Sequence, residues 1–178
     1  MSMMEAVKSV FSKYAAFSGR ARRSEYWYFQ LFVLLIHMVF AVFLTHLDLY
    51  STPYYLDSAL EGLFSLAVFV PSLAVTWRRM HDIGKSGAWS LLGVVSLLAF
   101  CAFVIMLAIV YSATGSSASD AVMASIGLTV IGFFLAMLGI AVVMLIWLTR
   151  AGQPGPNRFG PDPRRTEPDA PEKAPWEY

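Results

Sequence analysis

Three short segments of this chain hold the residue types that could do chemistry, namely basic side chains, histidine and acidic side chains set among glycines. They are residues 17–27 (FSGRARRSEYW), 78–87 (RRMHDIGKSG) and 155–163 (GPNRFGPDP). The guanidinium group of arginine can bind a carboxylate or a phosphate through two parallel hydrogen bonds. These segments could therefore form ion pairs or bind an anion. The candidate residues are Arg20, Arg23, Glu25, Arg78, Arg79, His81, Asp82, Lys85, Asn157 and Arg158.

These residues allow three interpretations if the three segments lie on the same side of the molecule. In the first, which we favour, Glu25 and Asp82 pair with arginines of other segments and fasten the segments together. In the second, the basic residues form a pocket for the headgroups of anionic lipids. In the third, the same pocket takes a soluble phosphorylated ligand.

The spacing of the residues argues against two more specific sites. Residues 84–86 (GKS) resemble the end of a phosphate-binding loop, but that motif needs a glycine at the position of Arg79. His81 and Asp82 are too few ligands for a metal site, and a turn capped by Asp82 is the simpler role. We therefore expect no catalytic residue, no metal, no cofactor and no enzymatic activity.

Composition indicates the elements that position these segments. The 178 residues are 57% hydrophobic and only 14% charged, with a mean hydropathy of +0.60, whereas soluble domains are about 25% charged. Apolar runs of about 20 residues span a bilayer, so the sequence predicts an all-α membrane protein with four transmembrane helices. The second run is short and contains Pro71, so a re-entrant segment is the alternative there. The predicted helices cover about residues 26–47, 59–77, 88–112 and 121–149.

The basic residues predict the orientation of the helices. All 13 lysines and arginines fall before the first helix, between the second and third, or after the fourth. Because cytoplasmic loops are enriched in basic residues, we expect both termini and the middle loop in the cytoplasm. The net charge of +1 gives no indication of nucleic-acid binding.

The two ends of the chain differ from the spans. Residues 1–25 form a cytoplasmic segment in which positions 3–17 follow an amphipathic helical pattern, with Ser24 as a possible N-cap of the first span. We expect that helix to lie in the membrane interface; the alternative is packing on loops of the same protein. Residues 150–178 form a cytoplasmic tail with seven of the nine prolines, expected to be disordered after about residue 165.

Within the predicted spans the sequence offers little chemistry. His37 lies at mid-depth in the first span and is a functional candidate by position. A neutral histidine bonded to a serine or to the backbone is the simpler interpretation. In the fourth span a stripe of small side chains suits close helix packing, either within the chain or in a homo-oligomer. These are Ala121, Ser125, Thr129, Gly132 and Ala136.

The three segments resemble the signature stretches of the domain-of-unknown-function 805 family, which are small bacterial inner-membrane proteins. The similarity covers about residues 11–163, and the tail after Pro163 departs from it. The resemblance implies a multi-helix protein of the inner (plasma) membrane and no established biochemical activity.

The function expected from all these observations is that of a non-enzymatic membrane protein. Its basic cytoplasmic face would contact anionic lipid or a partner. One alternative is a small oligomeric transporter or channel, which would need polar groups along a path. A second is a membrane enzyme acting on lipid headgroups, for which only His81, Asp82 and Lys85 offer groups.

Overall fold

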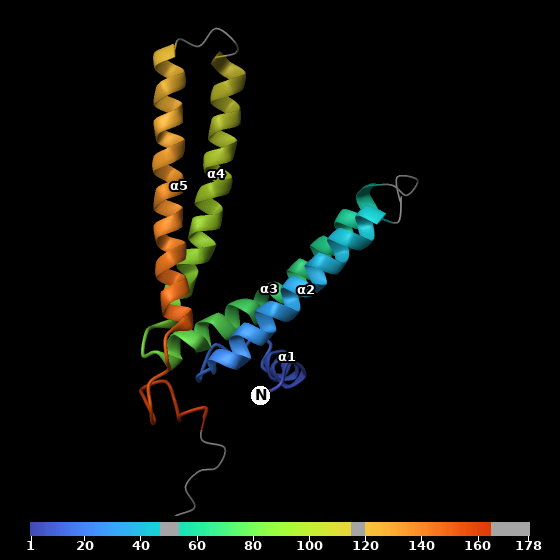
Figure 1. Ribbon diagram of the computed structural model, residues 1–178, viewed down its shortest axis with the longest axis vertical. Coiled ribbons are helices and arrows are strands. Elements are labelled where there is room, and N and C mark those ends of the chain that lie inside the picture. The colour runs from blue at the N-terminus through green and yellow to red at the C-terminus, as the bar shows by residue number, and fades with distance from the viewer. Residues whose placement is uncertain (47–53, 115–119, 165–178) are drawn as a thin grey trace, which may run out of the picture. The chain divides into compact units, whose positions relative to one another are not determined.

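A computed structural model describes residues 1–46, 54–114 and 120–164 of the chain. Regular secondary structure in these ranges is helical, and a single antiparallel bridge pairs Asn157 with Gly160. The chain divides into two units, the first made of Met1–Gly87 with the segment from Ala151 onward and the second of Ala88–Arg150. The helices are α1 (Met3–Ser12), α2 (Arg23–His46), α3 (Tyr54–Asp82), the 3-10 turn η2 (Gly87–Ser90), α4 (Leu91–Thr114) and α5 (Asp120–Thr149), as Figure 1 shows.

Four helices of the described chain are long and apolar enough to cross a membrane, which confirms the expectation of an all-α protein with four candidate spans. Large apolar side chains point outward along them, and Leu66 and Leu128 remain 69% and 72% exposed. In water such surfaces would be costly, at roughly 25 cal/mol for each Å². A bilayer removes that cost. The apolar stretches are Arg23–Val42, Ala59–Asp82, Gly87–Ala113 and Ala124–Thr149.

Helix α3 corrects the sequence prediction at its C-terminus. It is one helix of 29 residues, and Pro71 lies inside it as the predicted span requires. It also continues beyond residue 77 to Asp82, so the first half of the predicted basic loop is helical. The prediction ended the helix where charges began, but Arg78 and Arg79 are buried and paired, as described below.

Gly84 terminates α3. Its φ of +76° is left-handed, which glycine adopts without strain. The Gly84 N–H donates to the carbonyl of His81 at 3.0 Å, and the Lys85 N–H donates to that of Met80 at 3.0 Å. These two bonds make a Schellman cap. The predicted turn is therefore real, but Gly84 and Lys85 make it and Asp82 belongs to the helix.

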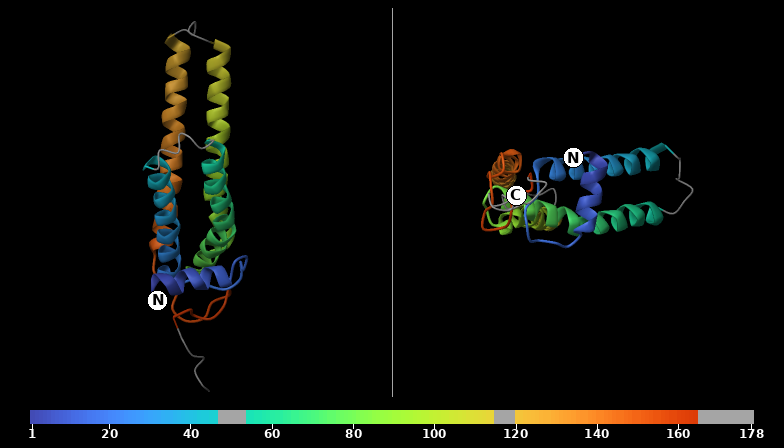
Figure 2. Two further views of the ribbon diagram at one scale, coloured as in Figure 1. Left: turned by 90° about the vertical axis from the view of Figure 1, so that its right-hand side faces the viewer. Right: turned by 90° about the horizontal axis from the view of Figure 1, so that it is seen from below.

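Helix α1 lies across α2 and α3 (Figure 2). A capping box between Ser2 and Glu5 begins it, and it ends at Ser12, earlier than the predicted pattern. Ala6 and Val10 are fully buried, and Phe11 meets Phe29 of α2 edge-on at 5.7 Å. Part of its apolar face therefore packs on the protein itself. Ser24, expected as an N-cap, lies one residue inside α2.

The second unit consists of the rest of η2 after Gly87 together with α4 and α5, and α4 and α5 lie side by side (Figure 1). Aromatic contacts hold these elements together. Phe103 of α4 stacks on Phe133 of α5 at 4.3 Å, and Trp89 of η2 meets Trp147 of α5 edge-on at 5.6 Å. In the stripe of small residues, Ser125, Thr129, Gly132 and Ala136 are exposed. The side chain of Ala121 lies outside the described residues.

Candidate functional site

Asp82, the last residue of α3, is the centre of the site and only 2% of it is exposed. Arg20 donates to its Oδ1 from Nε at 3.0 Å and from Nη2 at 2.8 Å. Arg79, one turn earlier in α3, donates to Oδ2. Arg20 and Arg79 are themselves buried, so the charges of all three groups are removed from water. Two guanidinium groups from different segments thus hold one carboxylate.

Arg20 also binds the segment that follows α5. Its Nη2 donates to the carbonyl of Gln153 at 2.5 Å, and its Nη1 to that of Gly155 at 2.6 Å. The backbone N–H of Gln153 in turn donates to the carbonyl of Asp82 at 2.8 Å. Gly152 lies so close that a Cβ there would sit 2.0 Å from Oδ2 of Asp82. One arginine side chain therefore connects three segments that are far apart in the sequence.

A second buried ion pair joins α3 to α2. Nη1 of Arg78 lies 3.2 Å from Oε1 of Glu25, and the hydroxyl of Ser9 in α1 donates to the same oxygen at 3.0 Å. Glu25 is in the first turn of α2, where the helix dipole favours a negative charge. Among the described residues, Nη2 of Arg78 has no hydrogen-bond partner. We call Arg20, Glu25, Arg78, Arg79 and Asp82 the arginine–carboxylate cluster.

His81 and Phe159 form the other side of the site. Their rings stack at 3.9 Å with an interplanar angle of 4°. Nδ1 of His81 lies 3.0 Å from the carbonyl of Gly19, so this nitrogen carries the proton and donates. The guanidinium of Arg158 lies over the Phe159 ring, 4.6 Å from its centre. The histidine is therefore held by a hydrogen bond on its edge and by an aromatic ring on its face.

Asn157 holds the loop that carries Phe159. Its Nδ2 donates to the carbonyl of His81 and to Oε1 of Gln153, both at 3.0 Å. Its Oδ1 accepts the N–H of Phe159 at 2.9 Å, and its backbone exchanges two bonds of 3.0 Å with Gly160. An asparagine suits this position because its amide both donates and accepts.

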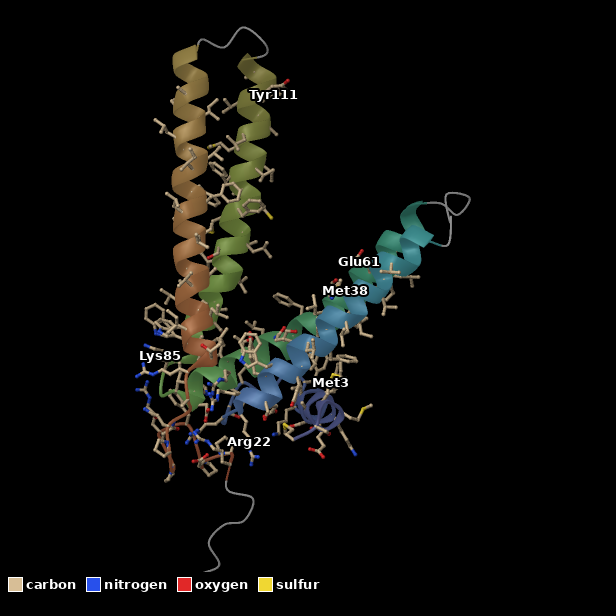
Figure 3. All side chains as sticks on the ribbon, in the orientation of Figure 1. Met3, Arg22, Met38, Glu61, Lys85 and Tyr111 are labelled. Carbon is tan, nitrogen blue, oxygen red and sulfur yellow. The ribbon has the colours of Figure 1, made fainter. Side chains whose placement is uncertain are left out.

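Basic side chains surround this cluster at its edge, where Figure 3 shows nitrogen atoms gathered near Arg22 and Lys85. Nε of Arg22 donates to the carbonyl of Pro163, and Nη2 of Arg164 donates to that of Gly152 at 2.6 Å. The sequence prediction missed Arg22, Gly152, Gln153 and Arg164. Arg22 lies inside the first of the three segments and Arg164 directly follows the third, so both could have been found from the sequence, whereas Gly152 and Gln153 give no such signal. We call Arg22, Arg23, Lys85, Arg158 and Arg164 the basic face.

His37 lies away from the cluster, on α2. Its Nδ1 is 2.9 Å from the carbonyl of Val33, and its Nε2 is 3.2 Å from the hydroxyl of Ser65 on α3. Phe64 meets the ring edge-on at 5.3 Å. The carbonyl must accept, so Nδ1 donates to it. The histidine thus connects α2 to α3 through the Ser65 hydroxyl.

No group of three His, Cys, Asp or Glu residues that could hold a metal ion occurs in the described ranges. The protein family DUF805, proteins of unknown function, matches residues 14–161. The chain belongs to this family. It is 38% identical to the inner membrane protein YhaI of Escherichia coli K12 over 161 residues, which are 90% of this chain and 97% of that protein. It is 27% identical to YhaH of the same strain over 163 residues, 90% and 98% of the two chains. No solved structure matches.

The family assignment and the fold agree. DUF805 residues 14–161 include the whole arginine–carboxylate cluster and all four candidate spans. The related YhaI and YhaH are inner membrane proteins, and this chain has the helices that such a location requires.

Proposed function

We propose that this DUF805 protein is a non-enzymatic inner-membrane protein whose basic face contacts anionic lipid headgroups on the cytoplasmic side. The observation that carries the proposal is that some of its arginines are buried in ion pairs whereas others are exposed. Arg20, Arg78 and Arg79 are buried on carboxylates. Arg23, Arg158 and Arg164 remain exposed around them. Anionic headgroups attract such residues by about 1 kcal/mol for each basic side chain near the surface.

The engagement of the potential catalytic groups supports a non-enzymatic role. Both carboxylate oxygens of Asp82 bind arginines. The ring of His81 is covered by Phe159 and bonded to the carbonyl of Gly19. Groups held in this way fasten segments together and do not stand ready to take a proton from a substrate.

The exposed side of α1 supports the same location. Met4 is 75% exposed and Phe11, two turns later, is 39% exposed. Lys8 lies between them and is exposed as well. Apolar and basic side chains on one helix suit the headgroup region of an anionic membrane. We infer that α1 lies in the cytoplasmic interface.

Lipid analysis of the purified full chain tests the proposal. The protein is extracted from native membranes in mild detergent, and bound lipids are quantified by mass spectrometry against the bulk membrane. We expect enrichment of anionic lipids, and loss of that enrichment when Arg23, Lys85 and Arg158 are all changed to Gln. The thermal stability of this variant is measured in parallel. Bound lipid that mirrors the bulk composition would contradict the proposal.

A further inference from the structure

A cavity of about 310 Å³ opens beside the arginine–carboxylate cluster. This volume is at the lower end of small-ligand sites, which run from about 300 to 1,000 Å³. The cavity has room for a phosphate group with a small substituent. Its lining residues are Arg22, Arg23, Ser24, Asp82, Gly152 and Arg164.

The charges around this cavity are mainly positive. Asp82 lines it, but Arg20 and Arg79 already bind its two oxygens. The nearby carboxylate of Asp162 lies 3.6 Å from Arg164 and also accepts backbone N–H groups. The charged groups at or beside the cavity are therefore two carboxylates and five arginines. The arginines are Arg20, Arg22, Arg23, Arg79 and Arg164. The excess positive charge predicts an anionic occupant.

The beginning of α2 adds to this field. Arg23 and Ser24 are the first residues of a 24-residue helix, and both line the cavity. A helix N-terminus carries about half a positive charge and presents backbone N–H groups that have no partner within the helix. Ser24 adds a hydroxyl, and the arginines add guanidinium groups whose geometry matches the oxygens of a phosphate.

We propose that this cavity binds a phosphate group, carried either by an anionic lipid headgroup or by a free phosphate compound. The proposal rests on the proposed function and specifies which residues of the basic face bind the anion. Arg22 and Arg164, which both line the cavity, hold the phosphate oxygens, and the start of α2 supplies further donors.

The experiment compares two sources of phosphate using the full-length chain. In neutral detergent, inorganic phosphate is titrated while the melting temperature is followed. In lipid nanodiscs, phosphatidylcholine alone is compared with mixtures containing phosphatidic acid or phosphatidylglycerol. The variants are R22Q and R164Q, with K13Q in the segment after α1 as the control that removes the same charge from an exposed position outside the cavity. R23Q replaces either cavity variant if that variant fails to fold.

We expect R22Q and R164Q each to weaken phosphate binding about tenfold or more, the usual effect of losing one charged hydrogen bond. K13Q should bind as the wild type does. A response to phosphatidic acid without one to inorganic phosphate identifies a lipid, and the reverse identifies a free compound. If anionic lipids still bind but R22Q and R164Q behave like K13Q, the cavity proposal is wrong and the proposed function stands. If no anion binds at all, both are wrong.

Discussion

The hydroxyl of Tyr14 donates a hydrogen bond of 2.6 Å to the carbonyl of Ala67 in α3. Ala67 lies four residues before Pro71, and proline has no N–H to give to that carbonyl. A side chain from the segment after α1 therefore takes the place of the missing helical donor. This contact explains how α3 can continue through a proline and why α1 is attached to it.

Replacing Tyr14 with Phe tests this relationship. We expect Y14F to lower the free energy of unfolding by about 1 kcal/mol, because the Ala67 carbonyl loses its donor. P71A supplies a backbone N–H to the same carbonyl, so Y14F should cost much less in the P71A background. Chemical denaturation in detergent of the two single variants and the double variant measures the coupling. If Y14F lowers the free energy of unfolding equally in both backgrounds, Tyr14 does not replace the missing helical donor. The control is Y28F, at an exposed position of α2.

The buried carboxylate of Asp82 should be the most sensitive polar position of the first unit. Changing it to Asn leaves Arg20 and Arg79 buried without their counter-charge, and breaking a buried pair in this way costs about 3–5 kcal/mol. E61Q makes the same change at an exposed position of α3 and should be nearly neutral. Melting curves of both variants measure the difference. Similar melting temperatures would show that the ion pairs do not fasten the segments.

Close packing at Gly152 gives a second stability test. A methyl group there would meet Oδ2 of Asp82 at 2.0 Å, so G152A must displace either the carboxylate or its own backbone. We expect a loss of about 2 kcal/mol or more, in the range of other overpacked sites. G62A, where a Cβ meets nothing within 4 Å, should be stabilising by up to about 1 kcal/mol because alanine favours the helix. A neutral G152A would contradict the described approach of the two segments.

The carboxyl group of Asp162 leads to a prediction about the stability of the protein in acid. The backbone N–H of Arg164, with that of Gly155, holds the pKa of the Asp162 carboxyl below its ordinary value. A lowered pKa in the folded state stabilises the protein above the unfolded pKa of about 4, and this contribution is lost as the pH falls through the folded pKa. We therefore expect D162N to melt below the wild type at pH 7, with the gap closing below about pH 4. A gap that is independent of pH would exclude this cause.

Much of the fold could be predicted because a bilayer selects helices locally. A run of about 20 apolar residues must be helical in lipid wherever it occurs, so the four candidate spans followed from composition. The boundaries were less predictable. Charges at Arg78 and Arg79 indicated the end of a span, but α3 continues because both are neutralised. Glu25, distant in the sequence, pairs with Arg78, and Asp82, one turn on in the same helix, pairs with Arg79.

The sequence by itself determined the class of protein and the three segments that matter, since both depend on residue types and short spacings. It also favoured arginine partners for Glu25 and Asp82. Only the tertiary structure decided which arginine each carboxylate takes. Arg20 lies 62 residues from Asp82 and 133 from Gln153, and no local rule connects such positions. Their distances depend on how α2, α3 and the segment after α5 pack, and packing also creates the cavity beside them.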